Sequence, residues 1–181
     1  EVSRAATTTL NRDELIQNVV TLIRDRFDLY YVGLFMIDNE QKMAVLKAGT
    51  GEAGKIQLAR RHALPMNHES MIGTAVVTGR ARVEQDVTQA QSFTFNPILP
   101  KPRSELALPL RSRGNIIGAL TVQSVDVAAF SHETITILQS LADQLAVSIE
   151  NADLFAQTQD TLARTSHLFQ TSRRMSQART S

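Results

Sequence analysis

The sequence predicts an α+β domain. Two apolar hairpin patterns, with a helix-period segment before the first and a longer one after the second, indicate strands bracketed by helices. The chain has 181 residues, which fits one domain with a helical extension and leaves little room for two full cores. Hydrophobic residues make up 43% and charged residues 20%, which are ordinary values for a globular protein, so we expect a folded core.

The first helix is expected over residues 11–27. Asn11 can serve as its N-cap, and Glu14 follows three residues later, as in a capping box. Its apolar residues form a stripe wider than one core-facing side, which predicts packing on two sides. Residues 31–37 and 43–48 are apolar runs separated by a polar turn, and we expect them to form a hairpin.

The middle of the chain, residues 49–102, is less regular. Three glycines at its start are expected to loosen the chain, and residues 56–61 to form one or two helical turns. Short strands are predicted over 63–66 and 81–84, with a small helix over 70–78 that stops at Gly79.

Residues 86–102 show no periodicity, yet their apolar side chains are too many for a solvated loop. These residues are Phe93, Phe95, Ile98 and Leu99. We therefore expect this segment to pack over something.

A second hairpin is predicted over 104–111 and 116–124. Pro109 has no N–H to donate, so its strand should be an edge at that point or carry a bulge. The last helix should begin at Ser131 as N-cap, and no Gly or Pro follows to end it. It carries two apolar stripes, of which one can pack on the domain while the other, with Phe155, Leu162 and Phe169 at seven-residue spacing, meets a partner helix.

Charge and composition exclude several functions. Lys plus Arg total 19 and Asp plus Glu 18, a net charge of +1 that favours neither nucleic acid nor an anionic membrane. The absence of cysteine excludes disulfides, thiolate metal sites and a cysteine nucleophile. No apolar stretch approaches the ~18 residues of a membrane span, so we expect a cytoplasmic protein. Because the sequence starts at Glu1 without Met, we expect a piece of a longer polypeptide.

Several sequence blocks resemble those of the GAF domain family and follow the family's order. They are YVGLFMID at 31–38, AGTG at 48–51, SMIG at 70–73, RSELALPL at 103–110, IGALTVQS at 117–124, FS at 130–131, LADQLA at 141–146 and IENA at 149–152. The resemblance implies a central antiparallel sheet of five or six strands. It also implies terminal helices on one face and a loop-rich insertion with a short helix over a ligand pocket on the other. We expect a flank at 1–10, the domain at 11–155 and a helical linker to a downstream module at 156–181.

The chain looks most like the copies in bacterial multi-domain sensors such as sensor histidine kinases. This resemblance implies a non-enzymatic sensory module that binds a small molecule or a partner, forms a homodimer and relays a change through its helices to an effector in the same polypeptide. The alternative is a structural dimerisation or spacer domain whose pocket is filled by its own side chains. Inward-pointing Phe93 or Phe95 would favour that alternative.

The chemistries known in this family leave the cofactor unassigned. Its free-methionine-sulfoxide reductases and covalent bilin attachment depend on cysteine, which this chain lacks. The Asn-Lys-x-n-Phe-x-x-x-Asp-Glu signature of its cyclic-nucleotide binders is missing. Cyclic nucleotide and haem both stay open as ligands, although the sequence supports neither. His62 and His68 lie in the pocket-covering region but have no second metal-type ligand at suitable spacing, and no catalytic constellation stands out. The paired arginines at 60–61 and at 111 and 113 are interpreted as solvated.

Two sets of site residues are predicted. The candidate ligand contacts are Phe35, His68, Ile72, Val76, Phe93, Phe95, Leu99 and Leu108. The candidate dimer contacts are Leu15, Val19, Leu22, Leu141, Leu145, Phe155, Leu162 and Phe169. The sequence does not assign strand faces to the pocket, because both alternating sets of residues in 31–37 are apolar.

Overall fold

The protein, seen in a computed structural model, is described over residues 2–91 and 93–178. Its elements in chain order are α1 (Val2–Arg26), β1 (Tyr31–Asp38), β2 (Met43–Gly49), α2 (Gly51–Ala59), β3 (Ala63–Pro65), α3 (Met71–Thr78), β4 (Arg82–Glu84), β5 (Ser104–Ser112), β6 (Asn115–Ser124) and α4 (His132–Ala178). The predicted α+β class and both predicted hairpins are confirmed.

All strands join one antiparallel sheet of six strands in the order β3-β2-β1-β6-β5-β4. The two hairpins meet at its centre through β1 and β6. β4 pairs with residues 105–107 of β5 and stops there, so Pro109 lies where β5 is an edge on that side, as its missing donor requires.

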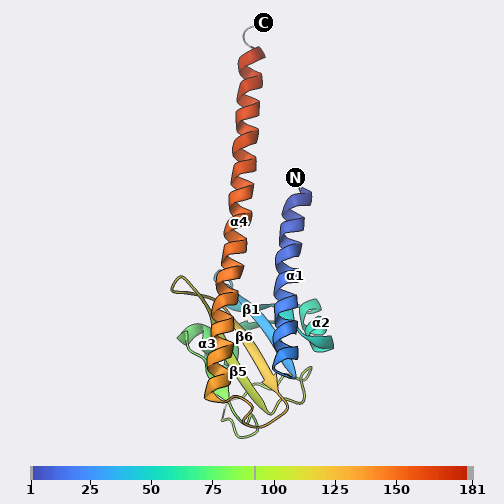
Figure 1. Ribbon diagram of the computed structural model, residues 1–181, viewed down its shortest axis with the longest axis vertical. Helices are drawn as coiled ribbons and strands as arrows, with labels where there is room; N and C mark the ends of the chain where they lie inside the picture. The colour runs from blue at the N-terminus through green and yellow to red at the C-terminus, as the bar shows by residue number, and fades with distance from the viewer. Residues whose placement is uncertain (1, 92, 179–181) are drawn as a thin grey trace.

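The two faces of the sheet carry different layers. α1 and α4 lie side by side on one face, over a core that holds Val32 and Leu34 of β1 together with Leu106, Leu108 and Leu110 of β5 (Figure 1). Phe35 and Ala119 point to the opposite face, where α3 and the loop insertion pack. This alternation follows from the two-residue period of a strand and confirms the expected layer arrangement.

The expected start of the first helix is wrong. α1 begins at Val2, so Asn11 lies within the helix rather than at its cap. Residues 2–10 contain no Gly or Pro, and extending an existing helix costs less than starting a new one, so the helical backbone continues through Asn11.

The glycines at 49–54 do not loosen the chain. Gly51 and Gly54 belong to α2, and a Cβ on Gly54 would collide with the backbone of Gly49. Glycine is therefore required here because α2 packs directly against the end of β2.

The predicted ends of α3 and the start of α4 are confirmed. Ser70 accepts a hydrogen bond from the Gly73 N–H at 2.9 Å, and Gly79 closes α3 in the left-handed conformation with φ of 64°. Ser131 accepts from the Thr134 N–H at 3.1 Å and so caps α4.

α1 and α4 project from the same end of the sheet, and α4 continues well beyond α1 (Figure 1). Arg12 of α1 forms an ion pair with Asp153 of α4 at 3.1 Å, close to where α4 leaves the core. From Leu154 to Ser176 nearly every side chain of α4 is exposed. Among the described helices, none combines the length and apolarity needed to span a bilayer.

Candidate functional site

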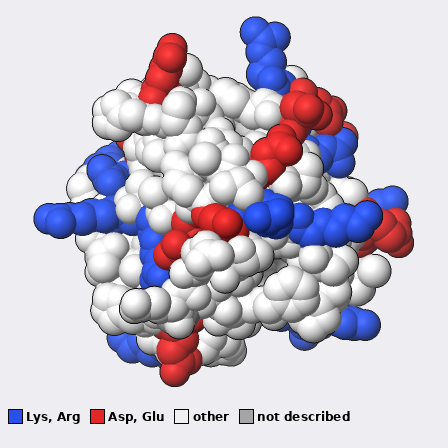
Figure 2. Space-filling model, turned by 90° about the horizontal axis from the view of Figure 1, so that it is seen from below, with Lys and Arg blue, Asp and Glu red and all other residues white. Residues whose placement is uncertain are grey.

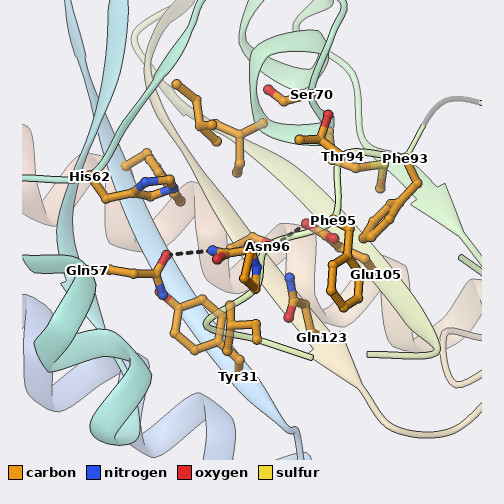
Figure 3. Close-up of a pocket in the computed structure, with 17 residues that line it drawn as sticks. Tyr31, Gln57, His62, Ser70, Phe93, Thr94, Phe95, Asn96, Glu105 and Gln123 are labelled. Atoms are coloured by element: carbon orange, nitrogen blue, oxygen red, sulfur yellow. Dashed lines mark hydrogen bonds between the residues drawn. The ribbon is translucent and has the colours of Figure 1, made fainter. Parts of the chain in front are cut away.

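A cavity of about 220 Å³ lies between the insertion-bearing face of the sheet and a segment that we call the lid, residues 93–99 (Figure 3). Its floor comes from β1, β5 and β6, and its sides from α2, the start of β3 and the start of α3. At ~30 Å³ for each water in the liquid, this volume corresponds to about seven waters. The cavity therefore has room for a small molecule.

The floor of the cavity is polar. Glu105 of β5 is buried and its Oε1 accepts a hydrogen bond from the Thr121 hydroxyl at 2.8 Å. Burial raises the pKa of Glu105 to about 7, although hydrogen bonds from Thr121 and from the side chain of Gln123 oppose this rise. The Gln123 Oε1, also buried, has no hydrogen-bond partner among the described residues.

A chain of hydrogen bonds joins the lid to the sheet through α2 (Figure 3). Asn96 in the lid donates from Nδ2 to the Gln57 Oε1 at 3.1 Å, and Gln57 donates from Nε2 to the Tyr31 hydroxyl at 3.3 Å. Burial raises the pKa of Tyr31 well above its ordinary value, so its hydroxyl stays protonated. Because the Gln57 side chain is buried, its amide needs hydrogen-bond partners within the protein, and Asn96 and Tyr31 supply them.

The upper wall is largely apolar. His62 meets Phe35 edge to face, with ring centroids 5.9 Å apart, and burial lowers its pKa, which favours the neutral imidazole. Phe93 packs from the lid onto the cluster that contains Phe35, whereas Phe95 is 55% exposed. No group of three metal-binding side chains occurs in the described ranges 2–91 and 93–178.

Five of the eight candidate ligand contacts come together around the cavity. They are Phe35, Ile72, Phe93, Phe95 and Leu99. His68, Val76 and Leu108 do not line it. His68 is exposed, and Val76 is buried in the apolar cluster on the sheet-facing side of α3. Leu108 points to the opposite face of the sheet, into the core under α1 and α4, because the alternation along β5 places Glu105 and Ala107 on the cavity side.

The polar residues of the floor are absent from the ligand contacts predicted from the sequence. Glu105 interrupts an otherwise apolar strand, and Thr121 and Gln123 alternate with Leu120 and Val122 on the next strand. Polar residues at two-residue spacing inside buried strands are the signal that could have found them.

The candidate dimer residues divide into three groups by exposure. Five are exposed, namely Leu15 and Leu22 on α1 and Phe155, Leu162 and Phe169 on α4. Val19 and Leu141 are half-buried against the core. Leu145 is 6% exposed and already packs inside the domain, so its side chain has no surface left to offer a partner.

The end of the domain opposite the helical projections carries charges of both signs. Figure 2 shows Lys and Arg interspersed with Asp and Glu on this face, with wide uncharged areas between them. This mixed pattern agrees with the near-balanced composition.

Comparisons with known proteins identify the family. The sequence model of the GAF domain matches residues 9–150. The chain is 27% identical over 115 residues to GAF domain-containing protein A of Dictyostelium discoideum, which covers 64% of this chain and 66% of that protein. It is 34% identical over 70 residues to hybrid signal transduction histidine kinase G of the same organism, covering 37% of this chain and 2% of that kinase. The chain thus spans just under two thirds of the first relative and a small part of the second.

Solved structures share the fold. The GAF domain of a phosphoenolpyruvate-protein phosphotransferase from Coxiella burnetii gives a TM-score of 0.73 at 20% identity, covering 86% of this chain and 96% of that one. A free methionine-R-sulfoxide reductase from Neisseria meningitidis, solved with its substrate, gives 0.67 at 22% identity, covering 80% and 81%. With the family match over residues 9–150, the chain belongs to the GAF domain family.

Proposed function

We propose that this chain is a non-enzymatic sensory module that binds a small molecule in the lidded cavity and relays its presence through α1 and α4 of a homodimer. The observation that carries this proposal is the cavity of about 220 Å³ beneath the lid, with its buried polar floor. A cavity with buried polar groups beneath an apolar wall is what a small-molecule site requires.

The structural-spacer alternative needs a cavity filled by the protein's own side chains. Phe93 does pack inward, but Phe95 remains more than half exposed and space is left beneath the lid. The Gln123 Oε1, which has no donor among the described residues, is an acceptor that a ligand in the cavity can use.

The absence of an enzymatic role is inferred from the residue types available. The free methionine-R-sulfoxide reductase shares the fold, but in the family that this chain resembles the reductase chemistry depends on cysteine, and this chain has none. The cavity instead offers one buried carboxylate, amides and hydroxyls, a set better suited to recognition than to nucleophilic chemistry.

A physical route for the relay runs from the lid to α1. Asn96 contacts Gln57 on α2, and α2 abuts the end of β2 at Gly49. Gln17 of α1 makes two hydrogen bonds to the backbone of Gly49. Its Nε2 donates to the Gly49 carbonyl at 2.9 Å, and its Oε1 accepts from the Gly49 N–H at 3.3 Å. A ligand that repositions the lid and α2 would thus shift α1, to the extent that it binds one arrangement better than the other.

The dimer proposal rests on the part of α4 that extends beyond the domain core, from Leu154 to Ser176. Phe155, Leu162 and Phe169 repeat every seven residues and are all exposed. Isolated helices of this kind gain most of their stability from packing on a partner. Because α1 and α4 project from the same end of the sheet, two copies packed in parallel would align both pairs of helices (Figure 1).

Native mass spectrometry of the freshly purified protein tests both parts. We expect a dimer that carries additional, removable mass after exposure to cell extract. A dimer that stays empty would favour the spacer alternative, and a monomer at high micromolar concentration would contradict the relay through paired helices.

A further inference from the structure

We propose that the cavity takes a small, largely apolar molecule that carries a protonated nitrogen, held by Glu105 and Gln123. This inference rests on the proposed sensory function and specifies the chemical class of its ligand. It follows from the charges, the hydrogen bonds and the volume of the cavity.

The carboxyl of Glu105 is the acidic group of the cavity, and burial keeps the lining His62 in its neutral form. Among the described residues that line it there is no Lys or Arg, and Glu105 is their one carboxylate. Arg82 lies close enough to influence Glu105, but its guanidinium is held by Glu84 at 3.4 Å and by Thr74 at 3.1 Å. An anionic ligand would therefore meet a carboxylate with no cation in the described wall to neutralise it.

The hydrogen bonds already made leave acceptors at the floor. The Thr121 hydroxyl is committed to Glu105, and Gln57 donates both amide hydrogens, to the Tyr31 hydroxyl and to the Ala53 carbonyl. The Gln123 Oε1 has no donor among the described residues, and Glu105 keeps lone pairs beyond its bonds with Thr121 and the Gln123 side chain. A ligand that supplies two or more N–H donors would satisfy both groups at once.

The raised pKa of Glu105 is consistent with a ligand that carries a protonated nitrogen. Burial raises its pKa to about 7, so a substantial share of the empty protein carries the neutral carboxyl near neutrality. An ammonium or amidinium group beside it would stabilise the carboxylate and complete a charge-assisted pair within the cavity.

The remaining wall sets the size and polarity of the rest of the molecule. Phe35, Leu64 and Phe93 are apolar, and the volume of about 220 Å³ suits a molecule no larger than a single substituted ring. The amino end of α3, at Ser70, is the part of the described wall that favours negative charge, so an anionic probe belongs in the test.

Three probes of matched shape separate the classes: 2-phenylethylamine, 2-phenylethanol and phenylacetate. Titrations followed by NMR at the side-chain amides of Gln57, Asn96 and Gln123 report binding at the cavity directly. We expect the amine to bind at least about tenfold more tightly than the alcohol, the size of one charge-assisted hydrogen bond, and phenylacetate to bind least.

Two variants assign the effect. Glu105→Gln keeps the shape of the side chain and should remove the preference for the amine, whereas Glu40→Gln, on the exposed β1–β2 turn, makes the same charge change and should leave it intact. Gln123→Met removes both the orphan acceptor and the amide hydrogen bond to Glu105 without a charge change, and should weaken the amine more than the alcohol. Equal binding of amine and alcohol, or a preference for amine that survives Glu105→Gln, would overturn the inference.

The test also separates this inference from the proposed function. Tighter binding of the alcohol or of phenylacetate would refute the cationic class and leave the sensory pocket standing. If no probe binds, native mass spectrometry after exposure to cell extract decides. A retained nitrogen base supports the cationic class, and a retained acid or neutral compound refutes it. No retained mass refutes both the cationic class and the proposed sensory function.

Discussion

Asn96 in the lid and Gln57 on α2 are joined by a hydrogen bond of 3.1 Å between the Asn96 Nδ2 and the Gln57 Oε1, across 39 positions of sequence. Asn96 also accepts from the Ile98 N–H at 3.0 Å, which holds the turn of the lid. One side chain thus both shapes the lid and fastens it to the wall of the cavity.

Asn96→Ala should release the lid without unfolding the domain. Each hydrogen bond contributes about 1 kcal/mol net, so we expect a loss of about 2 kcal/mol in local stability. Hydrogen exchange at the backbone amides of the lid should quicken, most visibly at Ile98 and Leu99. Asn39→Ala, at the exposed β1–β2 turn, is the matched control. Unchanged exchange in the lid would show that the bond does not hold it.

Glu105 makes the stability of the empty protein depend on pH. Its pKa rises from 4.5 to about 7 on folding, so folding favours the protonated carboxyl. This contribution is complete below about pH 4.5 and is lost as the pH rises through about 7, a change of about 3 kcal/mol. Arg82 and Glu84 on the neighbouring strand act on Glu105 in opposite directions.

Glu105→Gln cannot ionise and should escape this loss. Between pH 4.5 and pH 8, its free energy of unfolding should gain about 3 kcal/mol relative to the unmodified protein. Urea unfolding at both pH values measures the difference, with Glu40→Gln as the surface control. A difference that does not change with pH would mean that Glu105 is solvated in the folded state.

Leu162→Asp should weaken the proposed dimer and leave the domain folded. Leu162 is exposed on the part of α4 beyond the core, so the folded monomer does not depend on it. Loss of a buried leucine from each of two helices should raise the dissociation constant at least about tenfold. Sedimentation analysis measures this, and Gln157→Asp, on the other side of the helix, is the control. Equal association of the two variants would place the interface elsewhere.

Gly54→Ala should destabilise the domain although alanine favours helix by about 1 kcal/mol over glycine. The new Cβ would strike the backbone of Gly49, so α2 must move away from the end of β2. We expect a net loss of about 1–3 kcal/mol in urea unfolding, as for other overpacked sites. Lys55→Ala, an exposed neighbour in α2, should be nearly neutral. A more stable Gly54→Ala protein would disprove the close contact.

Much of the fold was predictable because its signals are local. Ser70 and Gly79 mark the ends of α3 by capping chemistry, and Pro109 correctly located an edge of β5. The prediction for the start of α1 was wrong because it used a local signal alone. Asn11 is a good N-cap residue, but nothing in the preceding residues stops the helix.

The site was harder to predict because strand parity is a property of the whole sheet. Both alternating sets in β1 are apolar, and tertiary packing alone sends Phe35 to the cavity and Leu34 to the helices. The same ambiguity misdirected attention to Leu108 and away from its neighbour Glu105. A charged residue in an apolar strand was the stronger clue, since its burial needs a reason.

The unbroken course of α4 gives it mechanical leverage. Helix α4 spans 47 residues without Gly or Pro, and at 1.5 Å per residue such a rod is about 70 Å long. The first turns of α4 pack against the sheet. A tilt of ~3° at this end would move the last turns sideways by roughly 4 Å. A rearrangement too small to disturb the packed core would thereby become a displacement large enough to change which residues of two such rods face each other.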